Sequence, residues 1–307
     1  MRTTARDIRF LVTVPLFLAA LAVAAAARPA GLAVSHRARS LQPGEVVLLR
    51  IGSTGPLDAL RVTAFDRSFP AWPSAKSTEW SALVGIDVDT APGRHLVAVT
   101  GTEADGREVA AAYPLDVVTR EFPTRQLTVD SKYVSPPDTV RGRIDEESRR
   151  MRAVLEAVSP DRSWAGRFGL PVPGKVVSEF GKRSVYNGES RGVHSGTDFR
   201  GAVGTRVRAP NAGRVALAAD LYYSGKTVLI DHGQGLYSHL GHLSAILVTE
   251  GEAVIGGQVV GRVGATGVVT GPHLHWSVRL AGTRVDPLSL VHVLRPPPAR
   301  KRKSVRD

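Results

Sequence analysis

The stretch Thr270-Gly-Pro-His-Leu-His-Trp-Ser-Val-Arg-Leu280 decides the fold class of the second half of the chain, because its apolar and polar residues alternate strictly. One face holds Leu274, Trp276, Val278 and Leu280, and the other holds His273, His275, Ser277 and Arg279. This period of two predicts a half-buried β-strand. The two imidazoles on its polar face would lie about 7 Å apart, so one could bind a metal while the other serves a bound water or substrate.

The residues around this strand also show a pattern typical of β-structure. From about Arg167 to Val293, short β-rich runs such as Arg214–Ala218 and Thr227–Asp231 alternate with frequent glycines. We therefore predict a second all-β domain, residues 166–293, built on an antiparallel sheet.

The first half of the chain also reads as β-structure. Short apolar runs between residues 32 and 120 are separated by the turn signals Gln42-Pro-Gly44, Ala91-Pro-Gly93 and Asp105-Gly106. Such punctuation is typical of antiparallel hairpins and predicts a small Ig-like β-sandwich. It holds no cluster of His, Asp and Glu, so we expect it to bind, to space or to cover the site.

Within residues 121–165, the stretch from Thr139 to Ser159 has a helical rather than a strand period. The apolar residues on one helical face are Ile144, Met151, Val154, Leu155 and Val158. A linker with one connecting helix is predicted, entered through Ser135-Pro-Pro137. The fold class is therefore mainly β: an N-terminal β-sandwich, a connecting helix and a C-terminal antiparallel β-sheet domain.

Both ends of the chain carry signals of their own. A basic start precedes an apolar run from Phe10 to Ala27, which is the pattern of an export signal in residues 1–27, either cleaved or retained as a membrane anchor. In both cases the rest of the chain would face outward, in the periplasm or cell envelope. Residues 294–307, with Arg300-Lys-Arg-Lys303, are predicted to form a basic disordered tail.

Composition limits the chemistry and the partners. There is no cysteine, so any metal must be held by histidines and carboxylates. The formal net charge of +12 fits a polyanionic wall or an anionic membrane surface, although solubility alone would also explain it. Nucleic acid is disfavoured as a partner, because the chain is expected to be exported.

Two further segments supply candidate site residues. In Gly192-Val-His194-Ser-Gly-Thr-Asp198, a regular strand would hold His194 and Asp198 about 13 Å apart, too far for one metal. Ser195-Gly196 offers a flexible break that could bring them together, but on its own the motif fits a capping Asp198 and a surface His194 better. In Gly235–Ser244, His239 and His242 fall on opposite faces of a strand, and spacing does not choose between them.

Taken together, these motifs resemble the lysostaphin and LytM-type zinc endopeptidases of peptidoglycan over residues 168–290. The matching elements, in the family's order, are Phe180-Gly181, His194-Ser-Gly-Thr-Asp198, Ala209-Pro-Asn-Ala-Gly213, Asp231-His-Gly233, His242-Leu-Ser244, Gly251-Glu-Ala-Val254, Gly257-Gln258, Gly261-Arg-Val-Gly264, Thr266-Gly267 and Thr270-Gly-Pro-His-Leu-His275.

The resemblance implies roles for five residues. His194, Asp198 and His275 take the positions of the ligands of one Zn²⁺, in an open site whose fourth position holds water. His242 and His273 take the positions of the catalytic histidines, and His239 falls at an ordinarily non-catalytic position. One departure is Leu240, which stands where relatives usually have a tyrosine two residues before the catalytic histidine, so activity could be reduced. The apolar Val268-Val269 could shift substrate preference.

The expected function is an exported zinc metalloendopeptidase that hydrolyses peptide cross-links of peptidoglycan, with stem peptides or cross-bridges as substrate and an envelope regulator as a further partner. The alternative is a catalytically weak or inactive relative that binds cell wall or activates an amidase. Ala209–Val215 and Gly251–Val254 would also suit a lipoyl or biotinyl carrier domain, but Lys226 does not stand at the required hairpin tip.

Overall fold

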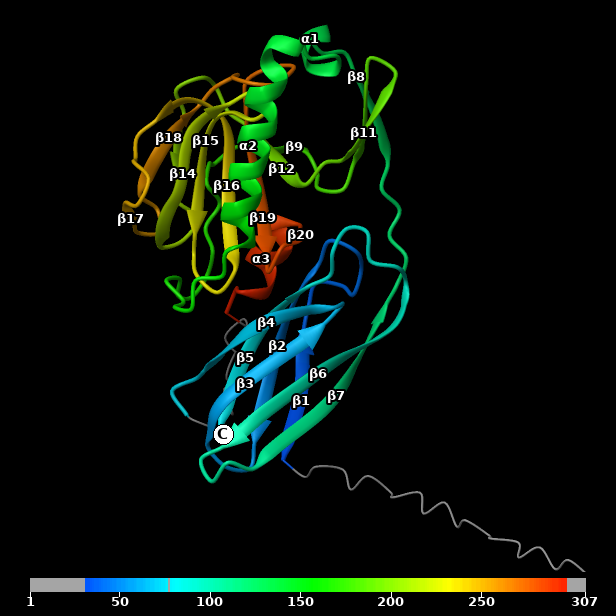
Figure 1. The fold of residues 1–307 in the computed structure, drawn as a ribbon, viewed down its shortest axis with the longest axis vertical. Helices are drawn as coiled ribbons and strands as arrows, with labels where there is room; N and C mark the ends of the chain where they lie inside the picture. The colour runs from blue at the N-terminus through cyan, green and yellow to red at the C-terminus, as the bar shows by residue number, and fades with distance from the viewer. Residues whose placement is uncertain (1–30, 77, 297–307) are drawn as a thin grey trace, which may run out of the picture.

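The computed structural model describes residues 31–76 and 78–296. The predicted signal or anchor, residues 1–27, lies outside this part, as does most of the predicted basic tail. No helix within the described ranges is long and apolar enough to cross a membrane. Two β-rich domains stack end to end, the N-terminal domain below the C-terminal one (Figure 1).

The N-terminal domain is a seven-stranded sheet in which β4 joins the two halves. Its strands are β1 (Leu32–Arg37), β2 (Val46–Ser53), β3 (Leu57–Ala64), β4 (Arg67–Pro73), β5 (Glu79–Gly85), β6 (Gly93–Glu103) and β7 (Glu108–Val117), and their spatial order is β1-β2-β5-β4-β3-β6-β7. Alternation of apolar residues along these strands buries one face, including Val97 and Val99, in the domain core.

The C-terminal domain is built on a ten-stranded antiparallel sheet. Its central path runs β17-β14-β15-β16-β19-β12-β9, with β13, β18 and β20 paired beside it. The strands are β9 (Val176–Ser178), β12 (Gly196–Arg200), β13 (Arg206–Arg208), β14 (Gly213–Leu221), β15 (Gly225–Asp231), β16 (Leu236–Ile246), β17 (Ala253–Val254), β18 (Val259–Val263), β19 (His273–Leu280) and β20 (Thr283–Val285). The predicted strand is therefore β19, between β16 and β12 in the interior of the sheet, and the fold class expected from the sequence is confirmed.

The segment between the domains contains more than a helix. It holds a short strand β8 (Thr124–Leu127), α1 (Ser131–Val134) and the long α2 (Asp138–Glu156). Strand β8 pairs in parallel with β10 (Arg183–Tyr186), which forms a hairpin with β11 (Glu189–Val193). Along α2, Met151, Val154 and Leu155 pack against an apolar cluster of the sheet: Leu217, Leu221, Leu229 and Tyr237.

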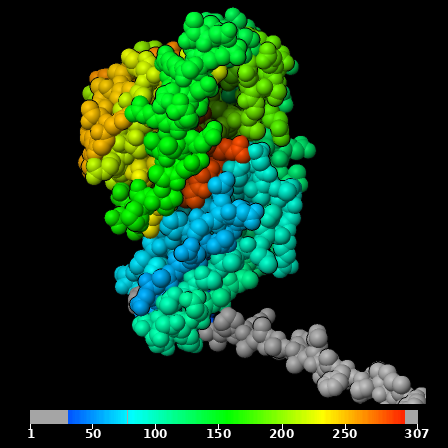
Figure 2. All heavy atoms as spheres, in the orientation of Figure 1, coloured from blue at the N-terminus to red at the C-terminus, as the bar shows by residue number. Residues whose placement is uncertain are grey.

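The two domains share one continuous apolar core. Helix α3 (Pro287–Val293) lies at their junction and packs on β2 as well as on β12 and β19 (Figure 1). The Trp72 and Trp164 rings, one from each side, meet edge to face at 5.2 Å. In the space-filling view the domains are in contact without a gap (Figure 2). Docking on this scale makes the N-terminal domain a fixed part of the molecule rather than a tethered module.

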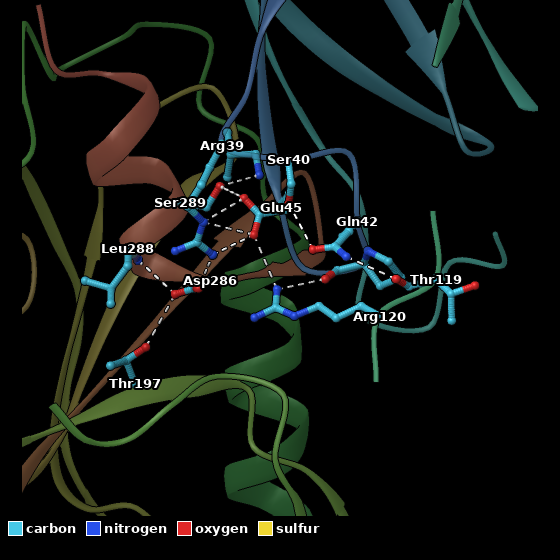
Figure 3. Close-up of polar contacts among 12 residues, drawn as sticks. Arg39, Ser40, Gln42, Glu45, Thr119, Arg120, Thr197, Asp286, Leu288 and Ser289 are labelled. Atoms are coloured by element: carbon cyan, nitrogen blue, oxygen red, sulfur yellow. Dashed lines mark hydrogen bonds and ion pairs between the residues drawn. The ribbon is translucent and has the colours of Figure 1, made fainter. Parts of the chain in front are cut away.

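A polar network fastens this junction around the fully buried Glu45 (Figure 3). Its carboxylate accepts hydrogen bonds from Arg39, from Arg120 and from the Ser289 hydroxyl of α3. Arg39 also pairs with Asp286, whose carboxylate caps α3 by accepting from the Leu288 amide. The network therefore ties the N-terminal domain and the start of the linker to the C-terminal helix.

His232, in the Asp231-His-Gly233 motif, is a structural histidine. Its Nδ1 lies 2.7 Å from the Ala212 carbonyl and its Nε2 lies 2.9 Å from the Ser238 hydroxyl, which in turn accepts from Trp276 Nε1–H. Nδ1–H therefore donates to the carbonyl and Nε2 accepts from the hydroxyl. Burial lowers the pKa of His232 to about 4.

Acidification should therefore destabilise the protein through His232. Below the ordinary histidine pKa of 6.5 the unfolded chain binds a proton that the folded chain does not, so the loss grows from pH 6.5 down to about 4. It reaches at most about 3 kcal/mol of unfolding free energy. We expect His232→Asn to be less stable at pH 7 but to lose less on acidification, as measured by urea unfolding at pH 7, 5.5 and 4.5. Equal pH slopes for the two proteins would refute this assignment.

Candidate metal centre

His194, Asp198 and His275 converge on one point at the sheet surface. Asp198 Oδ1 lies 3.0 Å from His194 Nε2 and 2.8 Å from His275 Nδ1, and the two ring nitrogens are 3.1 Å apart. All three side chains are largely buried. Burial raises the pKa of Asp198, but the close contacts with His194 and His275 outweigh it and hold that pKa well below its usual value.

The local backbone explains how His194 and Asp198, four positions apart in the sequence, reach the same point. Asp198 lies in β12, directly opposite His275 of β19, so sheet register brings these two together. His194 precedes the strand, and its amide donates to the Lys182 carbonyl rather than to the β12 ladder. Gly196 permits the fold between them, because a Cβ there would lie 2.5 Å from the Trp276 carbonyl and under 3 Å from the His275 ring. The pair is thus not held in one extended strand.

These donors fit a metal such as zinc. Nδ1 of His194 is 2.9 Å from the Glu179 carbonyl and donates its hydrogen there, which leaves the Nε2 lone pair directed at Asp198 and His275. Two neutral imidazoles and a carboxylate form the three-ligand set of open zinc sites, and a backbone carbonyl orienting one imidazole is the usual outer support.

His242 and His273 lie beside this point with a free ring nitrogen each. The Nδ1 atoms face backbone carbonyls, of Thr266 for His242 and of Gly271 for His273, at 2.9 and 2.8 Å. Both Nε2 atoms therefore remain available, and His273 Nε2 lies 3.8 Å from Asp198 Oδ1. The two rings lie 4.9 Å apart between centroids and are tilted by 57° to each other. Burial, with His275 and His273 nearby, lowers the pKa of His242 to about 3, so it is a neutral base before reaction.

His239 and Leu240 do not belong to this group of converging side chains. His239 Nδ1 lies 3.3 Å from the Ser277 hydroxyl, and its ring is 5.7 Å from that of His275, so it borders the metal ligands without joining them. Leu240 is fully buried in the apolar core and does not line the cleft. Tyr186 and Tyr223 do line it, so the cleft retains phenol groups from other segments.

The linker contributes to the wall of this cleft of about 580 Å³, which the sequence did not reveal. Arg125 of β8 donates to Ser178 and Ser184 hydroxyls at 2.6 and 3.0 Å, and its Nη1 lies 3.7 Å from Asp198 Oδ2. The guanidinium thus lies beside the Asp198 oxygen that does not contact His194 and His275. Its position depends on the parallel pairing of β8 with β10, a long-range register that no local sequence pattern encodes.

Loss of the Arg125 guanidinium should weaken metal binding. We expect Arg125→Met to lower zinc affinity about 10- to 100-fold, the usual effect of removing a group that supports a ligand. Competition with a fluorescent chelator measures this without any substrate. Arg191→Met, at another arginine lining the cleft, serves as the control, and equal affinities for Arg125→Met and the parent would refute the orienting role.

An antiparallel sheet that presents a His-Asp-His ligand set and two free imidazoles in an open cleft defines a metal-dependent peptidase. Residues 192–287 match the model of Peptidase family M23. A crystal structure of a peptidase M23 from Pseudomonas aeruginosa superposes with a TM-score of 0.64 and 32% identity, covering 82% of this chain and 95% of that one. The chain belongs to peptidase family M23, and the resemblance drawn from the sequence is confirmed.

Two curated relatives match over the C-terminal domain. Peptidoglycan DD-endopeptidase ShyA of Vibrio cholerae is 36% identical over 121 residues, 39% of this chain and 28% of that protein. The DD-carboxypeptidase/endopeptidase Mpg of Neisseria meningitidis is 38% identical over 116 residues, 38% of this chain and 27% of that protein. The match therefore spans little more than a quarter of these relatives' length.

Proposed function

We propose that this protein is an exported zinc metalloendopeptidase that hydrolyses peptide cross-links of peptidoglycan. The observation that carries the proposal is the convergence of His194 Nε2, Asp198 Oδ1 and His275 Nδ1 beside the free Nε2 atoms of His242 and His273. The relatives named as peptidoglycan endopeptidases match over the domain that holds these residues, which supports peptidoglycan as the substrate.

Each residue has a distinct part in hydrolysis. His194, Asp198 and His275 would hold the ion, and a bound zinc would supply Lewis acidity, lowering the pKa of water to about 7. His242 and His273 accept the proton of the attacking water and return it to the leaving amine. In each ring the Nδ1–H group donates to a backbone carbonyl, so both Nε2 atoms are already oriented for this transfer.

The location proposal rests on residues 1–27, whose basic start and apolar run would direct the chain to the periplasm or cell envelope, cleaved or anchored. A net charge of +12 is consistent with work at a polyanionic wall. An envelope regulator remains an expected partner.

Digestion of purified cross-linked peptidoglycan tests the activity. The chain lacking residues 1–27 is incubated with equimolar zinc, and soluble products are read by mass spectrometry beside His275→Ala and a chelated sample. Products that require cleavage of a cross-link, absent from both controls, would support a zinc endopeptidase and identify the bond. If zinc binds stoichiometrically but no product forms from the whole chain or from residues 166–293, the enzyme proposal fails and the binding or amidase-activating alternative replaces it.

A further inference from the structure

A second groove, of about 560 Å³, continues from the metal cleft beneath α2. The two depressions share Ser195, Tyr223, Ser224 and His239 in their linings, so they form one continuous surface. In the space-filling view α2 lies across the C-terminal domain, with the C-terminal strands exposed between it and the N-terminal domain (Figure 2). A peptide held at the metal could therefore extend along this groove.

The floor of the groove is the polar face of β19. Beyond His275 this face presents Ser277 and then Arg279, opposite His239 and Tyr237 of β16. His275 and Arg279 are four positions apart along the strand, which corresponds to about 13 Å. The same distance in an extended peptide is covered by about four residues.

Arg279 is a largely buried cation without a counter-charge. Its Nη1 is fully buried and has no hydrogen-bond partner, and no carboxylate within residues 31–76 and 78–296 forms an ion pair with it. Asp87 acts on it at a distance, but both Asp87 oxygens are engaged by Arg284. Burial lowers the pKa of Arg279 to about 10, so the group is still charged at neutral pH.

The other charged groups around the groove do not neutralise it. Arg67, which donates to the Ala281 carbonyl, and Arg152 of α2 also line the groove and add further positive charge. On α2, Glu147 is bonded to Arg143 and to the Tyr222 amide, and Glu156 is exposed and unpaired with Arg279. A buried unpaired cation is costly to a folded protein, so its retention in a groove that leads from an active site indicates a bound anion.

We propose that Arg279 binds a free carboxylate of the peptide substrate, about four residues from the bond that is cleaved, in a subsite beneath α2. Guanidinium and carboxylate are complementary in shape as well as in charge, and the partly desolvated groove strengthens their contact. This proposal rests on the proposed peptidase function and specifies its substrate: stem peptides with a free carboxylate, in preference to amidated ones.

The test compares two forms of one probe, a cross-linked muropeptide dimer with free carboxylates and the same dimer amidated with ammonia and carbodiimide. For the parent protein we expect a KM about tenfold lower for the free form. In Arg279→Met this preference should disappear, with kcat within about twofold. Arg206→Met removes an exposed arginine elsewhere on the same sheet and should keep the preference, whereas Arg279→Lys should keep part of it.

Two measurements distinguish failure of the Arg279 subsite from failure of the proposed peptidase function. Anisotropy of fluorescently labelled dimers on the chelated protein reports carboxylate preference without cleavage, so binding that depends on Arg279 would support the subsite even if no hydrolysis occurs. Cleavage of both forms with equal KM would overturn the subsite and leave the peptidase intact. Thermal unfolding gives a further check: loss of an unpaired buried cation should hold or raise the Tm of Arg279→Met, and a lower Tm with equal weakening of both probes would show a structural role only.

Discussion

Replacement of Asp198 by alanine is expected to reduce bound zinc from one equivalent to almost none and to lower kcat/KM by about 1,000-fold or more. The carboxylate is the only anionic donor among the three converging groups, and its Oδ1 lies within 3.0 Å of both histidine nitrogens. Without it, two neutral imidazoles remain, and the several kcal/mol that a bound metal contributes to the transition state are lost.

Metal content by mass spectrometry and hydrolysis of cross-linked muropeptides measure these two effects separately. Asp220→Ala is the matched control, because Asp220 lies exposed on β14 of the same sheet and should leave zinc content and rate within about twofold. An Asp198→Ala protein that still carried one equivalent of zinc and full activity would exclude His194, Asp198 and His275 as the ligand set.

The fold could be predicted because local patterns recur along the chain. Strict alternation over His273–Leu280 predicts β19, and the helical period of Met151, Val154 and Leu155 predicts the face that α2 packs on the sheet. Val158, expected on the same face, lies beyond the end of α2 and is exposed. Strands β1, β3 and β4 are harder to predict, since none holds an apolar run longer than three residues and β4 contains two prolines. Tertiary pairing, rather than local preference, makes these segments strands.

The site was harder to derive from spacing alone. A rise of 3.3 Å per residue in one strand would place His194 and Asp198 too far apart, but the strand is interrupted at His194 and Ser195, between β11 and β12, and the two side chains meet. Family resemblance, not geometry, selected His242 over His239, and the reason is local: His242 adopts a φ of 62°, which departs from regular strand alternation. Arg125 and Arg279 were not identified as site residues, because their surroundings come from distant segments.

Replacement of Glu45 by alanine is expected to lower the free energy of unfolding by about 3 kcal/mol, because removal of one partner from a buried ionic network leaves the others unpaired. Arg39 and Arg120 would lose their shared acceptor, although both are partly solvated, which limits the cost. Ser289 would lose its hydrogen-bond acceptor in the buried junction. Urea unfolding measures the effect. Glu103→Ala, whose partner Arg107 is exposed, should cost no more than about 1 kcal/mol.

The Glu45→Ala substitution should also weaken zinc binding, because two chains of contacts connect Glu45 to Asp198. Arg120, bonded to Glu45, directly precedes the linker, and Arg125, five residues after Arg120, lies against Asp198. Asp286, bonded to Arg39, also accepts from Thr197, the neighbour of Asp198 in β12 (Figure 3). We therefore expect Glu45→Ala to weaken zinc binding severalfold at temperatures where the protein is still folded, while Glu103→Ala does not. Loss of stability with unchanged zinc affinity would show that the junction holds the domains together without supporting the ligands.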